Sequence, residues 1–344
     1  MKVDQKSYLK VSHGFYCPID DEFVDSDLVV EVDELPYVSV GEIGVRPCSG
    51  PMVYDSGQNQ LIDCEGCGFI HSIPLPSDEE LRVFYTSKFY NQARKKDYFE
   101  NQRSQLKWWN FVFDRRLERL ERVLGRKGFI LDVGCGPGFF LSRARELGWG
   151  VLGIEPSADA AEYATQELAL PVKLGDISSL TRGEVEQTVD VVYSHGVVEH
   201  LRNPLSYLTK VRSLLGGDGL IFTSAANDFN PYQLAAVLSL DTDPWWIIPP
   251  EHLNYFSVAS LKKLHERSGF ELLHLETSFP IDQFLLMGED YISNPHIGAK
   301  CHSMRTQFEL TMHSVGLGPL LIKLAESFGR LGLGRQVDLI GKLK

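Results

Sequence analysis

Between residues 128 and 277 the hydrophobic positions follow two patterns that alternate along the chain. Short apolar runs bounded by glycine and polar residues alternate with segments in which apolar residues recur every three or four positions. The first pattern is typical of buried strands and the second of amphipathic helices. The first pattern predicts strands at residues 129–133, 150–155, 172–175, 189–194, 219–224 and 270–277. The second predicts helices at residues 139–147, 157–168 and 204–215. Such alternation predicts an α/β fold with a parallel sheet covered on both faces.

Other patterns flank or interrupt this region. Residues 97–124 predict one helix that ends at Gly125, because its apolar side chains recur on one face and glycine favours a helix C-cap. Residues 225–256 hold one predicted short helix, 232–240, in an otherwise irregular connection that is long enough to cover a site. The C-terminal tail is mostly helical and ends in a predicted strand at 336–341.

These patterns divide the chain into four parts. Residues 1–95 form an N-terminal module with four of the six cysteines, and residues 96–125 form a connecting helix. Residues 126–278 form the α/β core, and residues 279–344 form a helical insertion followed by the final strand.

Charge and hydropathy narrow the class of protein. The 344 residues carry a formal net charge of −12, and a surface of that sign repels phosphate backbones, so no nucleic-acid partner is expected. The basic runs Arg94-Lys95-Lys96 and Arg115-Arg116 are expected on solvated faces. No apolar run approaches the roughly 18–20 residues of a membrane-spanning helix, and the first residues lack the apolar region of a secretory signal. A cytoplasmic protein without a membrane partner is expected, and its oligomeric state is left open.

A glycine-rich loop carries the clearest chemical signal. The first predicted strand runs into the following helix through Asp132-Val133-Gly134-Cys135-Gly136-Pro137-Gly138-Phe139. Glycine lets a ligand approach the main chain, and a helix N-terminus offers free N–H groups to an anion. The dinucleotide fingerprint places its third glycine three residues after the second. Here Phe139 stands at that position, so the spacing argues against a nicotinamide cofactor.

Acidic residues follow three successive predicted strands. Asp132, Glu155 and Asp176 come at or just beyond the ends of the first, second and third strands. Because the carboxyl ends of parallel strands share one edge of a sheet, the three carboxylates are expected where α/β proteins bind ligands. Each alone could be a helix cap or a surface charge, but together with the loop they favour a cofactor site.

The loop and the three acids resemble motif I and its neighbours in class I methyltransferases, which use S-adenosylmethionine (SAM). The resemblance implies that the loop wraps the methionine part of SAM, that Glu155 binds the ribose hydroxyls, and that Asp176 binds the adenine amino group. The residues that it assigns to the cofactor are Asp132, Gly134, Gly136, Gly138, Phe139, Glu155, Asp176, Ile177 and Ser194. It also implies a Rossmann-like, seven-stranded sheet, with the last strand inserted antiparallel beside the sixth.

Two further runs resemble one branch of that superfamily. The fourth predicted strand is followed by Glu199-His200-Leu201-Arg202-Asn203-Pro204, and the irregular connection ends in Pro250-Glu251-His252-Leu253-Asn254-Tyr255-Phe256-Ser257. Both are similar to elements of methyltransferases from sugar and polysaccharide gene clusters. The branch implies carbohydrate biosynthesis, with a small-molecule acceptor such as a sugar or nucleotide-sugar hydroxyl, and makes residues 279–335 an insertion over the substrate side.

Histidines in these runs are candidate bases. Methyl transfer from a sulfonium is an in-line displacement, and a hydroxyl acceptor must lose a proton to a base. His200 and His252 are the two candidates, since histidine titrates near neutrality, and Tyr255 is a third candidate catalytic residue. His195 is expected to shape the site, and His200 could instead cap a helix. The sequence leaves open which histidine acts and whether oxygen, carbon or nitrogen is methylated.

The N-terminal module contains a cysteine knuckle. The run Cys64-Glu65-Gly66-Cys67-Gly68 is the type of turn that presents two thiolates to one zinc ion. The residues after it resemble the N-terminal module of some sugar methyltransferases, in which a second C-x-x-C pair completes the ligand set. Here only isolated cysteines precede it. One interpretation is a knuckle that has lost its metal. The other is structural zinc held by Cys17, Cys48, Cys64 and Cys67, with His71 able to replace one of them.

Other functions remain open from the sequence. A nicotinamide-dependent sugar-modifying enzyme is opposed by the glycine spacing and by the lack of a Tyr-x-x-x-Lys pair after the fourth predicted strand. A macromolecule methyltransferase could use the N-terminal module to bind RNA or protein, but the net charge opposes RNA. A non-catalytic module would keep the cofactor loop without the chemistry.

Overall fold

The computed structural model describes residues 13–16, 23–26, 37–43, 46–57, 59–85, 98–185, 187–240 and 242–344. The chain divides into two compact units. One comprises Met1–Leu75, Ala225–Leu264 and Leu275–Asp338, and the other comprises Pro76–Ser224, His265–His274 and Leu339–Lys344. Cys17 and the basic run Arg94-Lys95-Lys96 lie outside the described residues.

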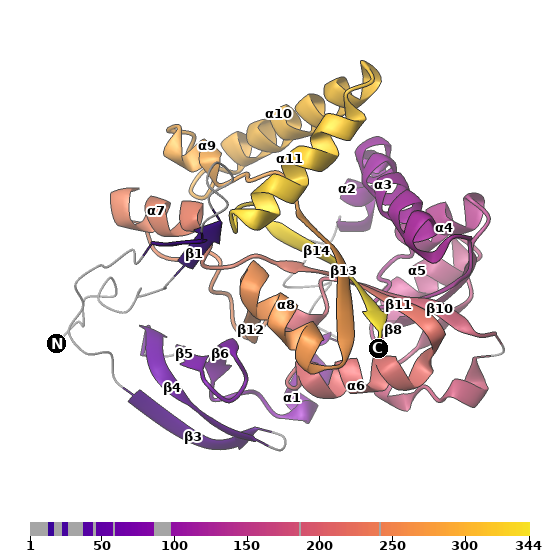
Figure 1. The fold of residues 1–344 in the computed structure, drawn as a ribbon, viewed down its shortest axis with the longest axis horizontal. Helices are drawn as coiled ribbons and strands as arrows, with labels where there is room; N and C mark the ends of the chain where they lie inside the picture. The colour runs from indigo at the N-terminus through magenta and orange to yellow at the C-terminus, as the bar shows by residue number, and fades with distance from the viewer. Residues whose placement is uncertain are drawn as a thin grey trace. The chain divides into compact units, whose positions relative to one another are not determined.

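A seven-stranded sheet has the strand order β13-β14-β11-β10-β7-β8-β9 (Figure 1). Its strands are β7 (Phe129–Val133), β8 (Gly150–Glu155), β9 (Val172–Leu174), β10 (Val189–His195), β11 (Leu215–Ala226), β13 (Phe270–Thr277) and β14 (Gln336–Leu343). β7 pairs in parallel with β8 and β10, and β10 pairs in parallel with β11. The predicted α/β fold and its seven strands are confirmed, and the last strand lies beside the sixth. The antiparallel direction of that strand stays a prediction.

β11 is longer than predicted. The run Gly216-Gly217-Asp218-Gly219 joins the predicted helix 204–215 to the predicted strand 219–224, so a turn is expected there, yet β11 begins at Leu215. Val189 pairs with Leu215 whereas Val191 pairs with Leu220, so the pairing register shifts between them. The glycine-rich run is therefore absorbed as an irregularity in the strand, where extra residues bulge out of the ladder.

Helices follow the strands of this sheet near their predicted bounds. They are α4 (Phe139–Glu146) after β7, α5 (Ala158–Gln166) after β8 and α6 (Pro204–Leu214) after β10. The helix predicted at 97–124 forms as two, α2 (Tyr98–Ser104) and α3 (Leu106–Leu124), separated at Gln105. The helix α3 ends at Gly125, whose φ of 77° and N–H bond to the Glu121 carbonyl make the predicted C-cap. Short helices α1 (Asp78–Val83), η3 (Ile177–Ser179), η4 (Arg182–Glu184) and η5 (Val198–His200) complete the segment.

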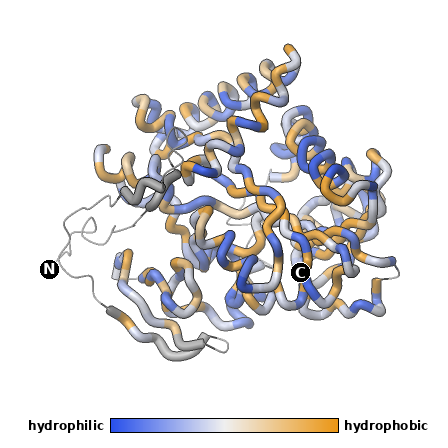
Figure 2. Tube along the Cα trace, viewed as in Figure 1, coloured by the Kyte–Doolittle hydropathy of each residue, from blue (hydrophilic) through white to orange (hydrophobic). Residues whose placement is uncertain are grey.

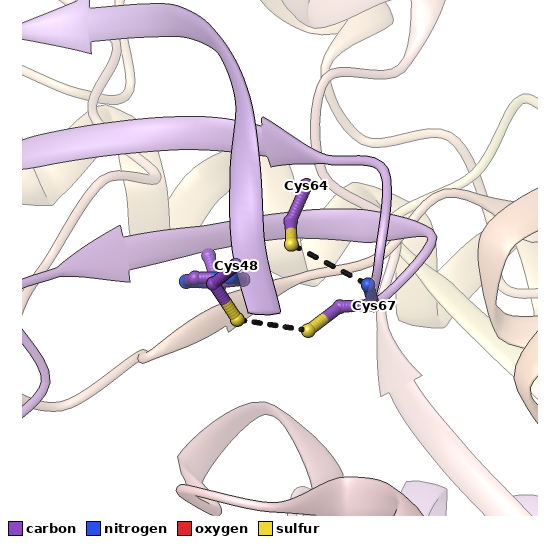
Figure 3. Close-up of side chains that lie close together, drawn as sticks. Cys48, Cys64 and Cys67 are labelled. Carbon is purple, nitrogen blue, oxygen red and sulfur yellow. Dashed lines mark hydrogen bonds between the residues drawn. The ribbon is translucent and has the colours of Figure 1, made fainter. Parts of the chain in front are cut away.

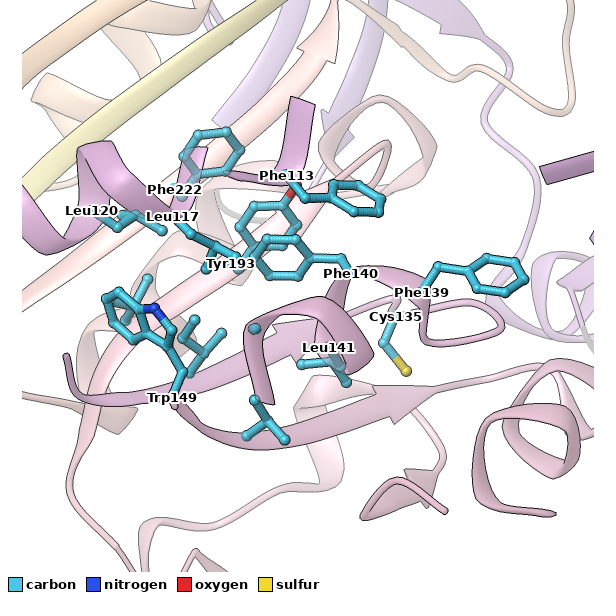
Figure 4. Packing of buried hydrophobic residues seen from close by; sticks show 14 of the residues in the cluster. Phe113, Leu117, Leu120, Cys135, Phe139, Phe140, Leu141, Trp149, Tyr193 and Phe222 are labelled. Atoms are coloured by element: carbon cyan, nitrogen blue, oxygen red, sulfur yellow. The ribbon is translucent and has the colours of Figure 1, made fainter. Parts of the chain in front are cut away.

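Aromatic side chains form the centre of the core between α3, α4 and the sheet (Figure 4). The rings of Phe140, Tyr193 and Phe222 stack, with centroid separations of 3.7 Å and 4.6 Å. Leu117 and Leu120 of α3 are fully buried against this group. Burial of such large apolar surfaces fixes α3 and α4 on the same face of the sheet and so holds the glycine loop in place.

The other unit contains a five-stranded sheet of order β12-β6-β5-β4-β3. Its strands are β3 (Tyr37–Ile43), β4 (Arg46–Asp55), β5 (Gln60–Cys64), β6 (Phe69–Ile73) and β12 (Asn254–Tyr255). β12 pairs antiparallel with β6, with Asn254 opposite His71. The irregular connection of residues 225–256 therefore packs with the N-terminal strands, whereas the sequence-based division placed it in the α/β core.

Helices and a hairpin complete this unit. The strands β1 (His13–Tyr16) and β2 (Phe23–Ser26) pair antiparallel. The helices are α7 (Pro231–Leu240), α8 (Val258–Arg267, shared with the other unit), α9 (Gln283–Leu286), α10 (Pro295–Ser314) and α11 (Gly318–Arg330). α10 and α11 lie side by side, and hydrophobic and hydrophilic positions alternate along both (Figures 1 and 2). Among the helices that the structure describes, none has the length and hydropathy of a membrane-spanning segment.

Candidate functional site

The glycine loop adopts a backbone conformation that favours glycine at three positions. Gly134, Gly136 and Gly138 have φ values of 68°, 54° and 83°. A Cβ at Gly138 would lie 2.5 Å from the side chain of Leu170, and one at Gly134 would lie 3.0 Å from Val197. The loop therefore needs glycine for its conformation and for close packing.

Glu155 joins the loop to the end of β8. Its Oε2 accepts a hydrogen bond from the Gly136 N–H at 2.8 Å, and its Oε1 accepts one from the Ser157 N–H at 2.9 Å. The side chain is buried, and burial raises the pKa of Glu155 to about 7, while the two backbone hydrogen bonds lower it. Each oxygen keeps a second lone pair, so the carboxylate can accept further hydrogen bonds from a ligand.

The other two predicted acids flank Glu155 on neighbouring strands. Asp132 lies in β7 and is buried, and burial and the Glu155 charge together raise its pKa. Asp176 follows β9 and is exposed, and its carboxylate accepts a hydrogen bond from the Ser178 N–H at 2.7 Å. The Gly175 N–H bonds to the Glu155 carbonyl. The structure thus places the three acids at the ends of adjacent strands, as the sequence predicts.

Three other residues assigned to the cofactor are less accessible. Phe139 is buried with its ring against Tyr163, and Ile177 is buried at the start of η3. Ser194 has no exposed surface, and its hydroxyl donates to the Phe222 carbonyl at 3.4 Å. A cofactor contact by Ser194 would therefore come from its backbone.

His200 lies in η5, just beyond β10. The backbone N–H of His200 bonds to the Val197 carbonyl, and its ring meets the ring of Tyr85 edge-on at 5.8 Å. The cap of the following helix is supplied by Asn203, whose side chain accepts from the Ser206 N–H at 3.0 Å. The N-cap of α6 is therefore Asn203 and not His200, whereas a role of His200 in fixing the loop stays open beside the catalytic one.

His252 and Tyr255 belong to the compact unit that does not contain His200. The Tyr255 hydroxyl donates to the His252 carbonyl at 3.0 Å. Tyr255 is 1% exposed, its ring contacts Phe229, and it shares a buried cluster with Trp246. The candidate catalytic role for Tyr255 does not fit this placement, because its hydroxyl is enclosed and already donates. Tyr255 supports the backbone that carries His252.

Arg116 is buried, although the sequence analysis expected its run on a solvated face. It is 6% exposed, and its guanidinium donates to the Tyr193 hydroxyl at 2.7 Å and to the Ser224 hydroxyl at 3.2 Å. It also lies 3.3 Å from Nδ1 of His195. Its spacing from Phe113 and Leu120 places it on the buried face of α3, so the helical period could have revealed it.

Three cysteines and a histidine form the second candidate site. Cys48 comes from β4, Cys64 from the end of β5, Cys67 from the turn after it and His71 from β6. Their ligand atoms all lie within 4.8 Å of one another. The Cys48 and Cys67 sulfurs are 3.6 Å apart, and the Cys67 N–H points at the Cys64 sulfur at 3.4 Å (Figure 3). The predicted ligand Cys17 lies outside the described residues, and His71 takes the fourth position of this group.

The orientation of His71 suits a ligand. Its Nδ1 lies 3.0 Å from the Ser72 carbonyl, which makes Nδ1 the protonated nitrogen. Its Nε2 is buried and makes no hydrogen bond of ordinary geometry to the described residues. Burial lowers the pKa of His71, but the sulfurs of Cys48 and Cys64 outweigh it and raise the pKa to about 9. A buried imidazole nitrogen beside three sulfurs matches the ligand chemistry of a closed zinc site.

Similarity to known proteins agrees with the arrangement at the edge of the seven-stranded sheet. Residues 99–275, just over half of the 344, match a family described as a methyltransferase domain. The chain is 33% identical over 173 residues to the ubiquinone biosynthesis O-methyltransferase of Ruegeria sp. (strain TM1040), a match that covers 46% of this chain and 68% of that protein. The protein of the same name from Ruegeria pomeroyi is 30% identical over the same length and coverage.

Solved structures with a similar fold are more distant. A SAM-dependent methyltransferase from Archaeoglobus fulgidus has a TM-score of 0.45 and 20% identity, and the likeness covers 72% of this chain and all of that one. The plantazolicin methyltransferase BpumL in complex with SAH has a TM-score of 0.47 and 15% identity, with coverage of 77% and 96%. The family assignment does not depend on these two structures.

The matched residues contain the glycine loop, the three strand-end acids and His200. The chain belongs to the methyltransferase domain family and is a SAM-dependent methyltransferase.

Proposed function

We propose that the protein transfers a methyl group from SAM to a hydroxyl oxygen of a small molecule. The observation that carries the proposal is the set of three carboxylates at adjacent strand ends beside a glycine loop with three positive φ values. The O-methyltransferase names of the relatives support oxygen as the acceptor atom.

The residues at this edge fit the chemical groups of SAM. The ribose has two hydroxyl donors, and Glu155 offers free lone pairs in a buried position. The adenine amino group is a donor, and Asp176 is exposed at the neighbouring strand end. The methionine part is small and zwitterionic, and we place it at the turn of Gly134, Gly136 and Gly138 before α4, as the family resemblance implies. When bound, SAM supplies an electrophilic methyl group.

The chain's own residues then orient the acceptor and take its proton. His200 and His252 are the candidate bases, and neutral imidazole is the form that accepts a proton near pH 7. Arg116 holds the ends of β10 and β11 through Tyr193 and Ser224. Alignment of the acceptor oxygen with the methyl group would supply much of the rate enhancement.

The relatives' names change the class of acceptor that we propose. The sequence motifs point to a sugar or nucleotide-sugar, whereas the relatives' names refer to ubiquinone biosynthesis, and nothing in the comparisons supports a carbohydrate. We therefore extend the proposed acceptors to hydroxyl groups on aromatic rings.

Calorimetric titration followed by a methyl-transfer assay tests this function. The protein should bind SAM and S-adenosylhomocysteine but not NAD. In the assay, SAM labelled in its methyl group is incubated with nucleotide-sugars, dihydroxyaromatic compounds, RNA and peptides, and label should appear in a small molecule. Label in RNA or peptide alone would replace the proposal by a macromolecule methyltransferase. Failure to bind SAM at millimolar concentration would remove the cofactor site.

We also propose that Cys48, Cys64, Cys67 and His71 hold a structural zinc ion. The proposal is supported by their four converging ligand atoms, their burial and the orientation of His71. Four protein ligands leave no open coordination position, so the metal would stabilise the fold of β4, β5 and β6 and not act on substrate.

Elemental analysis of purified protein tests the metal. Wild type should hold about one zinc per chain, and His71→Ala should hold much less. The matched control is Cys17→Ser, which should keep its zinc if His71 is the fourth ligand. Loss of zinc in Cys17→Ser with full zinc in His71→Ala would restore the four-cysteine set, and a metal-free wild type would end the claim.

A further inference from the structure

The cysteine cluster contains a pair of sulfurs in contact, and the roles described so far do not use this pair as such. The Cys48 and Cys67 sulfurs are 3.6 Å apart, and Cys67 reaches this contact from the turn after β5 (Figure 3). The N–H of Cys67 is directed elsewhere, at the Cys64 sulfur at 3.4 Å. The side chain of Cys67 thus faces Cys48, whereas its backbone faces Cys64.

The backbone around the pair holds the two sulfurs close together. The Glu65 N–H bonds to the Ser49 carbonyl at 3.0 Å, which ties the turn to the residue after Cys48. A Cβ at Gly50 would clash with the carbonyl oxygen of Asp63, so glycine is needed where β4 approaches β5. A disulfide brings its sulfurs to roughly 2 Å. Closing the 3.6 Å contact therefore needs a movement of roughly 1.5 Å between segments that are already hydrogen-bonded.

The two sulfurs differ in their access to solvent. Of the four residues of the cluster, Cys67 is partly exposed, whereas Cys48, Cys64 and His71 are buried. The susceptibility of a cysteine to oxidation rises with its exposure, and a second cysteine within reach converts the first oxidation product to a disulfide. An oxidant in solution would therefore meet Cys67 first, with the Cys48 sulfur beside it.

We propose that Cys67 and Cys48 form a peroxide-sensitive pair, in which Cys67 is oxidised and Cys48 then joins it in a disulfide. In the chain without metal, the Cys67 sulfur bonds to one oxygen of hydrogen peroxide, the O–O bond breaks, and the leaving oxygen departs with the thiol proton as water. The Cys48 sulfur then bonds to the Cys67 sulfur, the S–O bond of the sulfenic acid breaks, and hydroxide leaves with the Cys48 proton as a second water. The two sulfurs lose two electrons, which reduce the peroxide.

The consequence of this reaction rests on the proposed zinc site. A disulfide would leave Cys64 and His71 as ligands, and structural zinc is held by four protein ligands, so the oxidised cluster should not retain the metal. The pairing of β4 with β5 is made by backbone hydrogen bonds, and the disulfide would join the same two segments. The oxidised chain should therefore stay folded, and the metal content of the cluster would follow the redox state of the pair.

Disulfide mapping of peroxide-treated wild type tests the pair directly. Asp55 lies between Cys48 and Cys64 in the sequence, and Glu65 lies between Cys64 and Cys67. A protease that cleaves after aspartate and glutamate therefore places the three cysteines on separate peptides. Mass spectrometry should find the Cys48 peptide joined to the Cys67 peptide, and a zinc-sensitive dye should record about one zinc released per disulfide. Dithiothreitol followed by zinc should restore the metal content.

Controls separate this pair from general oxidation and from failure of the zinc site. Cys48→Ser removes the second sulfur, so the sulfenic acid at Cys67, trapped with dimedone, should rise several-fold over wild type. Cys301→Ser changes a buried cysteine of α10 and should oxidise as wild type does. A main disulfide between Cys64 and Cys67, or no disulfide in treated wild type, overturns the proposal. Wild type purified without zinc would refute the zinc site, whereas the disulfide map, which needs no variant, would still decide the pairing.

Discussion

At the scale of single residues, the proposed cofactor site contains a carboxylate, Glu155, that is unfavourable to ionise. Glu155 is buried, and the N–H groups of Gly136 and Ser157 offset part of the cost of its charge. Bound ribose hydroxyls would add donors and so favour the ionised form. The residue is therefore expected to serve ligand binding at the expense of the stability of the ligand-free protein.

Glu155→Gln is expected to weaken SAM binding by roughly 10- to 100-fold, because an amide offers one acceptor oxygen in place of two charged ones. Calorimetric titration of both proteins measures the change. Glu167→Gln, an exposed acid near the end of α5, is the matched control and should bind as wild type does. Equal affinities in Glu155→Gln and wild type would take Glu155 out of the cofactor site.

The same residue gives a prediction for pH. The pKa of Glu155 rises from 4.5 to about 7 in the folded chain, so between these values the folded state keeps a proton that the unfolded state loses. Its contribution to stability should therefore fall by about 3 kcal/mol as pH rises from 4.5 to 7. Urea unfolding of ligand-free wild type and Glu155→Gln measures this as a difference between the two proteins. A difference that stays constant across that range would contradict the prediction.

At the scale of elements, the turn between β7 and α4 combines a special backbone conformation with close packing. Gly138 has a positive φ and also no room for a Cβ, whereas Gly125, at the end of α3, has a similar φ with open space around it. A comparison of alanine substitutions at the two glycines therefore distinguishes the cost of backbone strain from the cost of a steric clash.

Gly138→Ala is expected to cost about 2–3 kcal/mol of unfolding free energy and to weaken SAM binding, since both the strain and the contact with Leu170 apply. The control Gly125→Ala should cost about 1 kcal/mol and leave SAM affinity unchanged. Denaturant unfolding and titration measure the two effects. If both variants lost the same stability and bound SAM equally, the clash at Gly138 would be unimportant.

The helix α3 gives the second prediction at this scale. Arg116→Ala leaves the hydroxyls of Tyr193 and Ser224 without their donor inside the core and opens a cavity, so a loss of about 2–4 kcal/mol is expected. Arg122→Ala changes an exposed residue of the same helix and should change stability by less than about 0.5 kcal/mol. Similar losses in the two variants would mean that the buried contacts of Arg116 contribute nothing measurable.

At the scale of the whole molecule, the two candidate sites lie in different compact units. The cysteine cluster is confined to residues 48–71, and the predicted cofactor residues lie between residues 132 and 194. A ligand bound at one site should therefore stabilise mainly its own unit.

Removal of the proposed zinc ion is expected to affect the stability of the N-terminal sheet and to leave SAM binding unchanged. A strong chelator should lower the temperature at which the N-terminal sheet unfolds, while SAM affinity stays within about twofold of its starting value. Calorimetric scanning with and without chelator, followed by titration with SAM, measures both, and His71→Ala should reproduce the effect of the chelator. Loss of SAM binding together with the metal would show that the two units are coupled.

Much of the α/β part could be predicted because its signals are local. The strands β7, β8 and β13 have the predicted bounds, and the positive φ values fall on the glycines of the loop. The errors arose where a local signal was weaker than a distant contact. A glycine-rich run suggested a turn but continues β11, and a charged pair suggested a solvated face although Arg116 meets partners on β10 and β11.

The sequence by itself determined the order of strands and helices, the glycine loop and the three acids at successive strand ends, because periodicity and backbone preference act over a few neighbouring residues. Only the tertiary structure decided that His71 completes the cysteine cluster, that Tyr255 is enclosed and that the Cys67 sulfur faces that of Cys48. These arrangements join residues distant in sequence or depend on packing around them, and burial and hydrogen bonding in the folded chain, not local spacing, bring them together.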